Sequence, residues 1–187
     1  MEDAQNADQA GVFTRLRDQL AGLNQGAEKR VRAGHLELGP DIWLSTDPSG
    51  GGEMMCRPAG QGAGQGFELH LNGGDTGKWA CLGMRFGPGA LTGLRYLGLL
   101  TALRGDGMAA FHPTLRYFRE GSEAQDVATA LPVILTGGGG SAGRAHFAHI
   151  PIEAARLEGI TGCELNLFFM RDSLAVTFDR IEPLRVL

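Results

Sequence analysis

Arginine and aromatic residues recur together in the middle of this 187-residue chain, where their planar groups could bind a polar ligand. The tripeptide Leu94-Arg95-Tyr96 returns further along as Leu115-Arg116-Tyr117. On two antiparallel strands, such residues would line up across one face. An aromatic ring offers a flat platform to the apolar face of a sugar, while planar polar side chains pair with its hydroxyl groups. We therefore predict a glycan-binding face that contains Trp79, Arg95, Tyr96, Asp106, His112, Arg116 and Tyr117.

The same residues have a structural interpretation that stays open at this point. Tyrosine and tryptophan in a β-sandwich often belong to the core, and an arginine beside them can cover the sheet. The arginines could also pair with Asp106, Glu120 or Glu123. The cluster as a whole therefore supports the glycan hypothesis better than any single member does.

The glycine-rich stretch 138–143 matches the spacing of two catalytic motifs without their context. Its GxGxxG pattern requires a following helix to hold a pyrophosphate, but Pro151 comes too soon for one. Its GxSxG pattern places Ser141 as a nucleophile, which requires an acid and then a histidine further along. The last histidine is His149, and no acid stands between it and Ser141. Neither motif predicts an active site.

The remaining catalytic candidates are weaker still. The stretch 73–78 resembles a phosphate loop, but it is one residue short and Trp79 replaces the magnesium-binding hydroxyl. His146 and His149 lack the carboxylates or thiolates that would complete a metal site, and no acidic pair suits a glycosidase. We predict that the chain is not an enzyme. One catalytic alternative stays open, which is a hydrolase or isomerase on a small β-barrel. It is supported by His112, His146 and His149.

The elements that must position these residues are mostly short strands. From residue 36 onward, β-branched, aromatic and leucine-rich runs alternate with Gly, Pro, Asn and Asp clusters, as in a sandwich or barrel. No helical crossovers separate the runs, which argues against a parallel α/β sheet. The predicted strands are 36–44, 53–57, 67–71, 78–86, 94–103, 108–118, 127–135, 145–152, 163–170 and 174–181.

One helix is predicted over residues 12–23, before the strands begin. Its apolar stripe needs a cover, either from the domain or from another copy of the chain, because an isolated helix of this length is marginal in water. The stripe consists of Val12, Phe13, Leu16, Leu20 and Leu23 at helical spacings. The sequence thus predicts an all-β fold, an antiparallel two-sheet β-sandwich over 31–187, preceded by a short helical segment within 1–30.

Composition narrows the classes of partner. With 17 basic and 21 acidic residues, the net charge of −4 gives no positive field for nucleic acid. No window approaches the ~20 apolar residues of a membrane span, and the acidic start at residues 1–8 does not resemble a signal peptide. Cys56, Cys81 and Cys163 are odd in number and far apart, so neither a disulfide scaffold nor a zinc site is indicated. We expect a chain that is cytoplasmic at synthesis.

The pattern from Trp79 to Leu187 resembles that of jelly-roll carbohydrate-binding modules and galactose-binding-like domains. The similarity rests on the leucine-rich strand 94–103, the His/Tyr/Phe strand that follows, and the late strands 163–169 and 174–181. It implies a jelly-roll arrangement of the sandwich and a polysaccharide ligand. The glycine-rich segment 49–66 has no counterpart in that pattern.

The same resemblance implies a structural calcium ion. In those families an aspartate of the last strand often helps to hold calcium near the chain ends. By position this residue would be Asp179, with Glu37 or Asp41 as partners from the first strand. Pairing of Asp179 with Arg180 or Arg185 is the alternative.

Two functional hypotheses follow. The first is a non-catalytic domain that recognises a cell-surface or capsular polysaccharide, as a receptor-binding spike or adhesin of a phage-like gene-transfer particle that is released by lysis. The second is a structural or protein-interaction sandwich in which helix 12–23 docks on a partner or joins copies of the chain.

Overall fold

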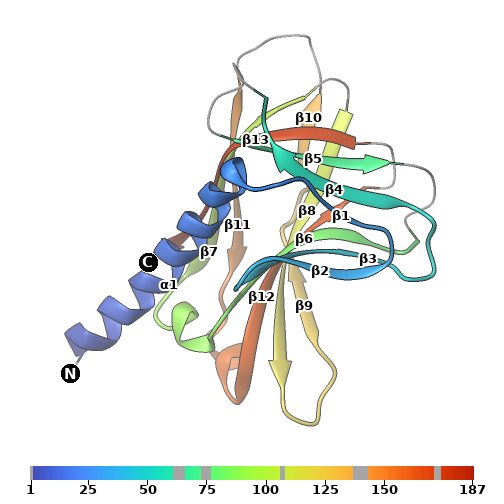
Figure 1. Cartoon of the computed structure of the whole chain (residues 1–187). Helices are drawn as coiled ribbons and strands as arrows, with labels where there is room; N and C mark the ends of the chain where they lie inside the picture. The colour runs from blue at the N-terminus through green and yellow to red at the C-terminus, as the bar shows by residue number, and fades with distance from the viewer. Residues whose placement is uncertain (1, 61–65, 73–76, 106–107, 137–142, 171–173) are drawn as a thin grey trace.

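Two antiparallel sheets face each other, and one long helix lies along their side (Figure 1). This computed structural model describes residues 2–60, 66–72, 77–105, 108–136, 143–170 and 174–187. The prediction of an all-β sandwich with an N-terminal helix is confirmed. Within the described ranges, no helix is both long and apolar enough to cross a membrane.

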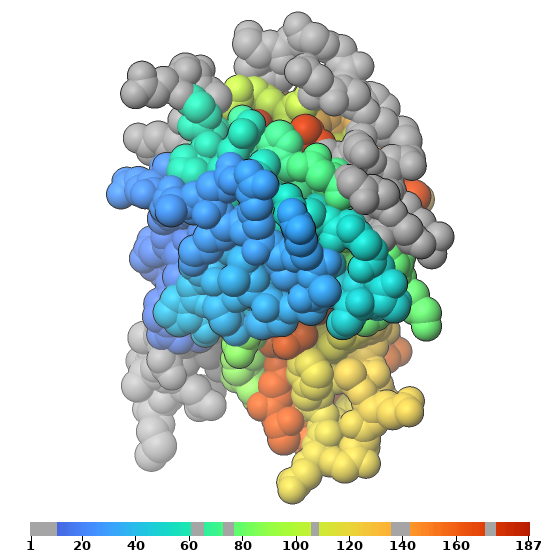
Figure 2. Space-filling model, turned by 45° about the vertical axis from the view of Figure 1, so that its right-hand side comes forward, coloured from blue at the N-terminus to red at the C-terminus, as the bar shows by residue number. Residues whose placement is uncertain are grey.

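Each sheet combines strands from distant parts of the sequence. The first sheet runs in the order β1 (Lys29–Val31), β4 (Glu53–Pro58), β5 (Phe67–Asn72), β13 (Leu174–Val186), β7 (Tyr96–Arg104) and β11 (Arg144–Pro151). The second runs in the order β10 (Val133–Thr136), β8 (Met108–Arg119), β12 (Ile160–Phe169), β6 (Ala80–Phe86), β3 (Ile42–Thr46) and β2 (Gly34–Gly39), and β9 (Gln125–Ala128) pairs with β8. Figure 2 shows the β8–β9 hairpin, in yellow, projecting beyond the body of the molecule.

Alternation along the strands builds the core between the sheets. In β12, Leu165 and Leu167 are buried in the core, while Glu164 and Asn166 lie on the opposite, outer face. Burying the inner set removes a large apolar area from water and is the main source of stability. The side chains on the outer face, which do not build the core between the sheets, can contact a ligand.

Two predicted strands are each divided in the structure. The range 36–44 spans parts of β2 and β3, and the range 127–135 spans parts of β9 and β10. Pro40 and Pro132 lie at the breaks. A proline has no N–H to donate to a strand ladder, so it favours a turn at these positions.

Helix α1 (Glu2–Gly22) is longer than predicted and belongs to the domain. Phe13, Leu16 and Leu20 are buried in the common core, and the ring of Phe13 lies 5.7 Å from that of Phe86 in β6. The Gln19 amide donates to Asp41 Oδ2 at 2.8 Å and accepts a hydrogen bond from the backbone N–H of Asp41 at 2.9 Å. These two bonds connect the helix to the β2–β3 turn. The domain itself, rather than another copy, therefore covers this stripe.

Candidate functional site

The outer face of the second sheet carries a hollow of about 540 Å³. Strands β2, β3, β6, β12 and β8 supply its floor and walls, together with the residues just before β6. Its volume falls within the range of roughly 300–1,000 Å³ that is usual for ligand sites. It is lined by His35, Trp43, Ser45, Lys78, Trp79, Cys81, Arg116, Glu164, Asn166, Phe168 and Phe169.

Strand register explains why the sheet is hollowed at this place. Cys81 of β6 lies between Ser45 of β3 and Phe168 of β12, so two small side chains stand next to a ring. In the neighbouring row, Gly83 lies opposite Trp43. A Cβ atom on Gly83 would lie 2.2 Å from the Trp43 ring, so the glycine lets the indole lie flat against the sheet.

The two tryptophans have different roles. Trp43 is only 3% exposed, because Arg85 lies 4.7 Å from its ring centroid and the His35 ring lies 5.5 Å away. Trp79 is 36% exposed, and its indole N–H donates to Ser45 Oγ at 3.4 Å. Trp43 therefore shapes the wall, while Trp79 has a ring that a ligand can reach.

Asp47 fixes the segment that carries Trp79. Its buried carboxylate accepts hydrogen bonds from the backbone N–H of Lys78 at 2.7 Å and from the N–H and hydroxyl of Ser49, both at 2.8 Å. Its own N–H donates to the Trp79 carbonyl at 3.0 Å. The Lys78 hydrogen bond, followed by those of Ser49, lowers the pKa of Asp47. The carboxylate is therefore ionised at neutral pH and holds this segment in place.

The polar wall opposite is held by an ion pair. Arg116 donates from Nε and Nη2 to the two carboxylate oxygens of Asp126 at 2.7 and 2.8 Å, which sets the plane of its guanidinium group. This guanidinium also lies 5.9 Å from the Phe168 ring centroid. Asn166 Nδ2 donates to Glu164 Oε2 at 3.5 Å. Oriented planar groups thus face the hollow alongside aromatic rings.

The chemistry of the hollow favours binding over catalysis. Burial raises the pKa of the Cys81 thiol to about 12, so it is not an activated nucleophile. Among the described lining residues, Glu164 is the one carboxylate, whereas glycosidases in most families use a pair. The arrangement can stack on a ring and hydrogen-bond to it.

Two of the predicted ligand residues, Trp79 and Arg116, do line the hollow. His112 lies on β8 opposite Phe168 and donates from Nε2 to the Thr129 carbonyl at 2.7 Å, so it supports the neighbouring loop. Asp106 lies outside the described residues. The structure thus brings one aromatic and one polar residue of the prediction together in the hollow, and their role in binding stays a prediction.

For the other three residues the prediction of one shared face is wrong. Tyr117 is 1% exposed and belongs to the core between the sheets. Tyr96 begins β7 in the first sheet, and Arg95 directly precedes it. The two Arg-Tyr copies do not lie side by side, because the connection from β7 to β8 crosses from one sheet to the other.

Sequence reasoning missed most of the polar floor. Glu164 and Asn166, together with the ring of Phe168, line the hollow and alternate with buried leucines in β12. This period of two could have indicated that the three residues share the outer face of the sheet. Trp43 gave no such signal. Its place in the wall depends on pairing with Gly83, which is remote in sequence.

The three residues proposed to bind calcium each have a separate protein partner. Asp179 accepts two hydrogen bonds from Arg104, so its expected pairing with Arg180 or Arg185 is wrong. Glu37 pairs with Arg85 and His35, and Asp41 bonds to Gln19. No cluster of three or more potential metal-binding side chains occurs among the described residues. These residues do not fit a shared calcium site, and calcium binding by the chain stays a prediction.

No protein-family model and no curated protein matches this sequence. Solved structures with similarity to the chain include carbohydrate-binding modules, the class that the sequence pattern resembles. The family 11 module from Clostridium thermocellum, complexed with a mixed-linked tetrasaccharide, has a TM-score of 0.47 at 12% identity and covers 86% of this chain and 96% of its own.

Two further matches are parts of larger chains. The N-terminal endo-1,4-beta-D-xylanase 10B of the same bacterium, complexed with xylohexaose, has a TM-score of 0.46 at 16% identity. The match covers 81% of this chain and 26% of the xylanase chain. Tailspike protein 4 of bacteriophage CBA120 has a TM-score of 0.42 at 9% identity, with 90% of this chain and 21% of its own covered.

Proposed function

We infer that this chain binds a carbohydrate chain in the hollow on the outer face of its second sheet and leaves the sugar chemically unchanged. The observation that carries this inference is the exposed ring of Trp79 at the wall of a hollow with a polar floor. A sugar ring has an apolar face and a rim of hydroxyl groups, and it therefore needs both kinds of surface at once.

The aromatic part of the site is preorganised. The Trp79 segment is held by Asp47, and the Trp79 indole is hydrogen-bonded to Ser45, so little side-chain freedom remains to be lost on binding. Stacking on a fixed ring costs less conformational entropy than stacking on a mobile one. This supports Trp79 as the platform for one sugar residue.

The polar part is oriented in the same way. The Arg116 guanidinium is fixed by Asp126, and the Asn166 amide is fixed by Glu164. Guanidinium, amide and carboxylate groups together can donate to and accept from neighbouring hydroxyls. We assign to Arg116 and Glu164 the role of hydrogen-bonding to the hydroxyl groups of the sugar, while Asn166, which is only 2% exposed, helps to hold Glu164 in place.

We also propose that the ligand is a cell-surface or capsular polysaccharide and that the chain acts as an adhesin or receptor-binding domain of a phage-like particle. The support is the position of the hollow on an outer sheet face, which suits a polymer that approaches from solution. The competing role of helix α1 as a docking element is disfavoured, because Phe13, Leu16 and Leu20 are buried in their own domain.

A glycan-array screen tests the proposal. The array includes bacterial capsular and lipopolysaccharide glycans, and it is run with calcium and again with chelator. We expect a defined set of bound glycans, lost in Trp79→Ala and kept in Leu187→Ala, which removes an exposed side chain at the chain end. A folded protein that binds no glycan, or equal binding by Trp79→Ala, would overturn the proposal.

A further inference from the structure

Exposed apolar side chains gather where the edges of the two sheets meet. Leu131, Ile134 and Phe147 are 78%, 47% and 56% exposed, and all three line a second hollow of about 350 Å³. His146 and His149 of β11 lie beside them. Contiguous exposed apolar surface of this kind marks an interaction site more often than isolated exposed residues do.

The strand that borders this patch, β11, is an open edge of the first sheet. It pairs with β7 on one side, and no described strand pairs with its other side. At eight residues it is longer than the edge strands β1, β2 and β10. Edge strands normally carry charges or prolines that block pairing. In β11, the charge of Arg144 and the proline at position 151 lie at the two ends, and the residues between them include neither Lys, Arg, Asp, Glu nor Pro.

Phe147 and His149 flank Ala148 in β11, and their rings lie near each other on the same face of the sheet. We propose that β11 pairs antiparallel with β11 of a second copy of this chain, with the two Ala148 residues opposite each other. In that register, Phe147 of each copy faces His149 of the other on the outer face of the sheet. These residues already form a ring row within one chain, with Phe147 6.3 Å from His149 and His149 5.0 Å from Tyr96. The pairing extends this row across both copies.

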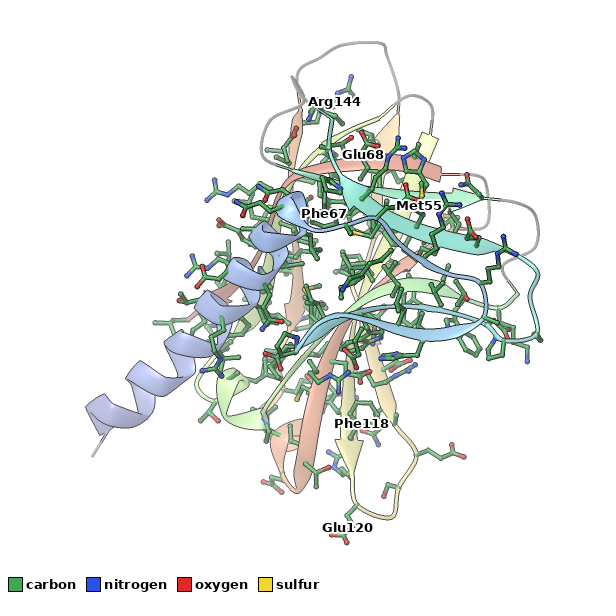
Figure 3. The ribbon with its side chains drawn as sticks, viewed as in Figure 1. Met55, Phe67, Glu68, Phe118, Glu120 and Arg144 are labelled. Carbon is green, nitrogen blue, oxygen red and sulfur yellow. The ribbon has the colours of Figure 1, made fainter. Side chains whose placement is uncertain are left out.

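The charges at the strand ends fit the same register. Arg144 begins β11 and lies at its upper end (Figure 3), and none of the described carboxylates forms an ion pair with it. The antiparallel pairing brings Arg144 beside residues 152 and 153 of the second copy. Glu153 has a side chain that is 59% exposed, with Arg156 as its partner in the chain. At each end of the joint edge, Arg144 of one copy and Glu153 of the other thus place opposite charges at neighbouring register positions.

A cysteine crosslink tests the register in the 187-residue chain. In this arrangement the Cα atoms of residue 148 lie about 5 Å apart, within disulfide range, whereas those of residue 145 lie about 20 Å apart. The chain's own cysteines are buried. We expect Ala148→Cys to give a covalent dimer under mild oxidation, and the matched Ala145→Cys to stay monomeric in denaturing gels. No crosslink in Ala148→Cys, or equal crosslinking in both variants, overturns the proposal.

Analytical ultracentrifugation over a concentration series tests the interface itself. We expect a monomer–dimer equilibrium that Phe147→Lys weakens roughly tenfold or more, while Met170→Lys, at an exposed apolar residue elsewhere, does not. Arg144→Glu and Glu153→Arg should each weaken the dimer, and the double variant should restore it. A chain that stays monomeric at every concentration would contradict pairing through β11. A dimer whose dissociation constant is the same in Phe147→Lys as in the wild type would also contradict it.

Discussion

The backbone N–H of Lys78 donates a 2.7 Å hydrogen bond to Asp47 Oδ2, so a carboxylate on one loop sets the position of the tryptophan on another. The turn is packed closely against this acid. Gly77 has φ of 78°, and a Cβ atom there would lie 2.5 Å from the Asp47 side chain. Asp47 is thus a positioning residue for Trp79.

Asp47→Ala removes the acceptor for Lys78 and Ser49, so the Trp79 segment loses its fixed position. We expect the affinity for the glycan to fall about tenfold, with a smaller loss in Asp47→Asn, which keeps one acceptor oxygen. Isothermal titration with a soluble oligosaccharide measures both. Unchanged affinity in Asp47→Ala would show that Trp79 does not need this support.

The anchor also predicts a pH dependence. The pKa of Asp47 is lowered from its ordinary value of 3.8, first by the Lys78 hydrogen bond and then by those of Ser49. A carboxyl with a lowered folded-state pKa stabilises the fold fully above its unfolded pKa, and this contribution is lost as pH falls through the folded pKa. The stability difference between wild type and Asp47→Asn should therefore be constant above about pH 5 and shrink below 3.8. Thermal melts from pH 7 to 2 measure it, and a difference that grows in acid would contradict the role.

Gly83 offers a test of the wall formed by Trp43. A methyl group at this position would collide with the indole, so Gly83→Ala should lower the free energy of unfolding by about 1–3 kcal/mol. Gly162→Ala is the matched control, because its Cβ atom would lie 3.9 Å from Phe118, at ordinary contact distance. Urea unfolding compares the two variants. Equal stability would mean that Trp43 moves aside without cost.

Helix α1 is predicted to be part of the core. Leu16→Ala should lower the free energy of unfolding by about 2–5 kcal/mol, because Leu16 is almost fully buried. Arg15→Ala, at an exposed position on the same helix, should have little effect. Chemical denaturation and ultracentrifugation of both variants provide the readout. A stable Leu16→Ala variant with an altered oligomeric state would instead favour the helix as a docking element.

The fold class was predictable because alternation and turn residues are local signals. The strand predicted over 108–118 is found as β8, and Gly121, with φ of 68°, lies in the turn that follows it (Figure 3, where Phe118 and Glu120 mark this hairpin). The sheet to which each strand belongs was not predictable in the same way. A glycine-rich turn reverses the chain equally well within one sheet or between two, and this ambiguity misplaced Tyr96 relative to Arg116.

Only those site residues could be predicted that residue type alone suggests, without knowledge of how the strands pair. Trp79 and Arg116 were found by residue type, whereas Tyr117 has the same ligand-like type and is in the core. Arg116 and Tyr117 are adjacent in β8, and adjacent residues of a strand point to opposite faces of the sheet. One of them therefore lines the hollow, and the other lies in the core. Asn166 was missed because its role depends on strands that pair across the sequence.

The binding of a sugar against Trp79 is tested most directly by isothermal titration calorimetry. A soluble oligosaccharide that the glycan array identifies is titrated into the wild-type protein and into matched variants. We predict that Trp79→Ala weakens binding at least about tenfold and that Trp79→Phe, which keeps a ring, retains part of the affinity. Phe147→Ala, which removes an exposed ring from the first sheet, should leave the per-site affinity unchanged. Equal affinities for wild type and Trp79→Ala, in a folded protein, would contradict the account.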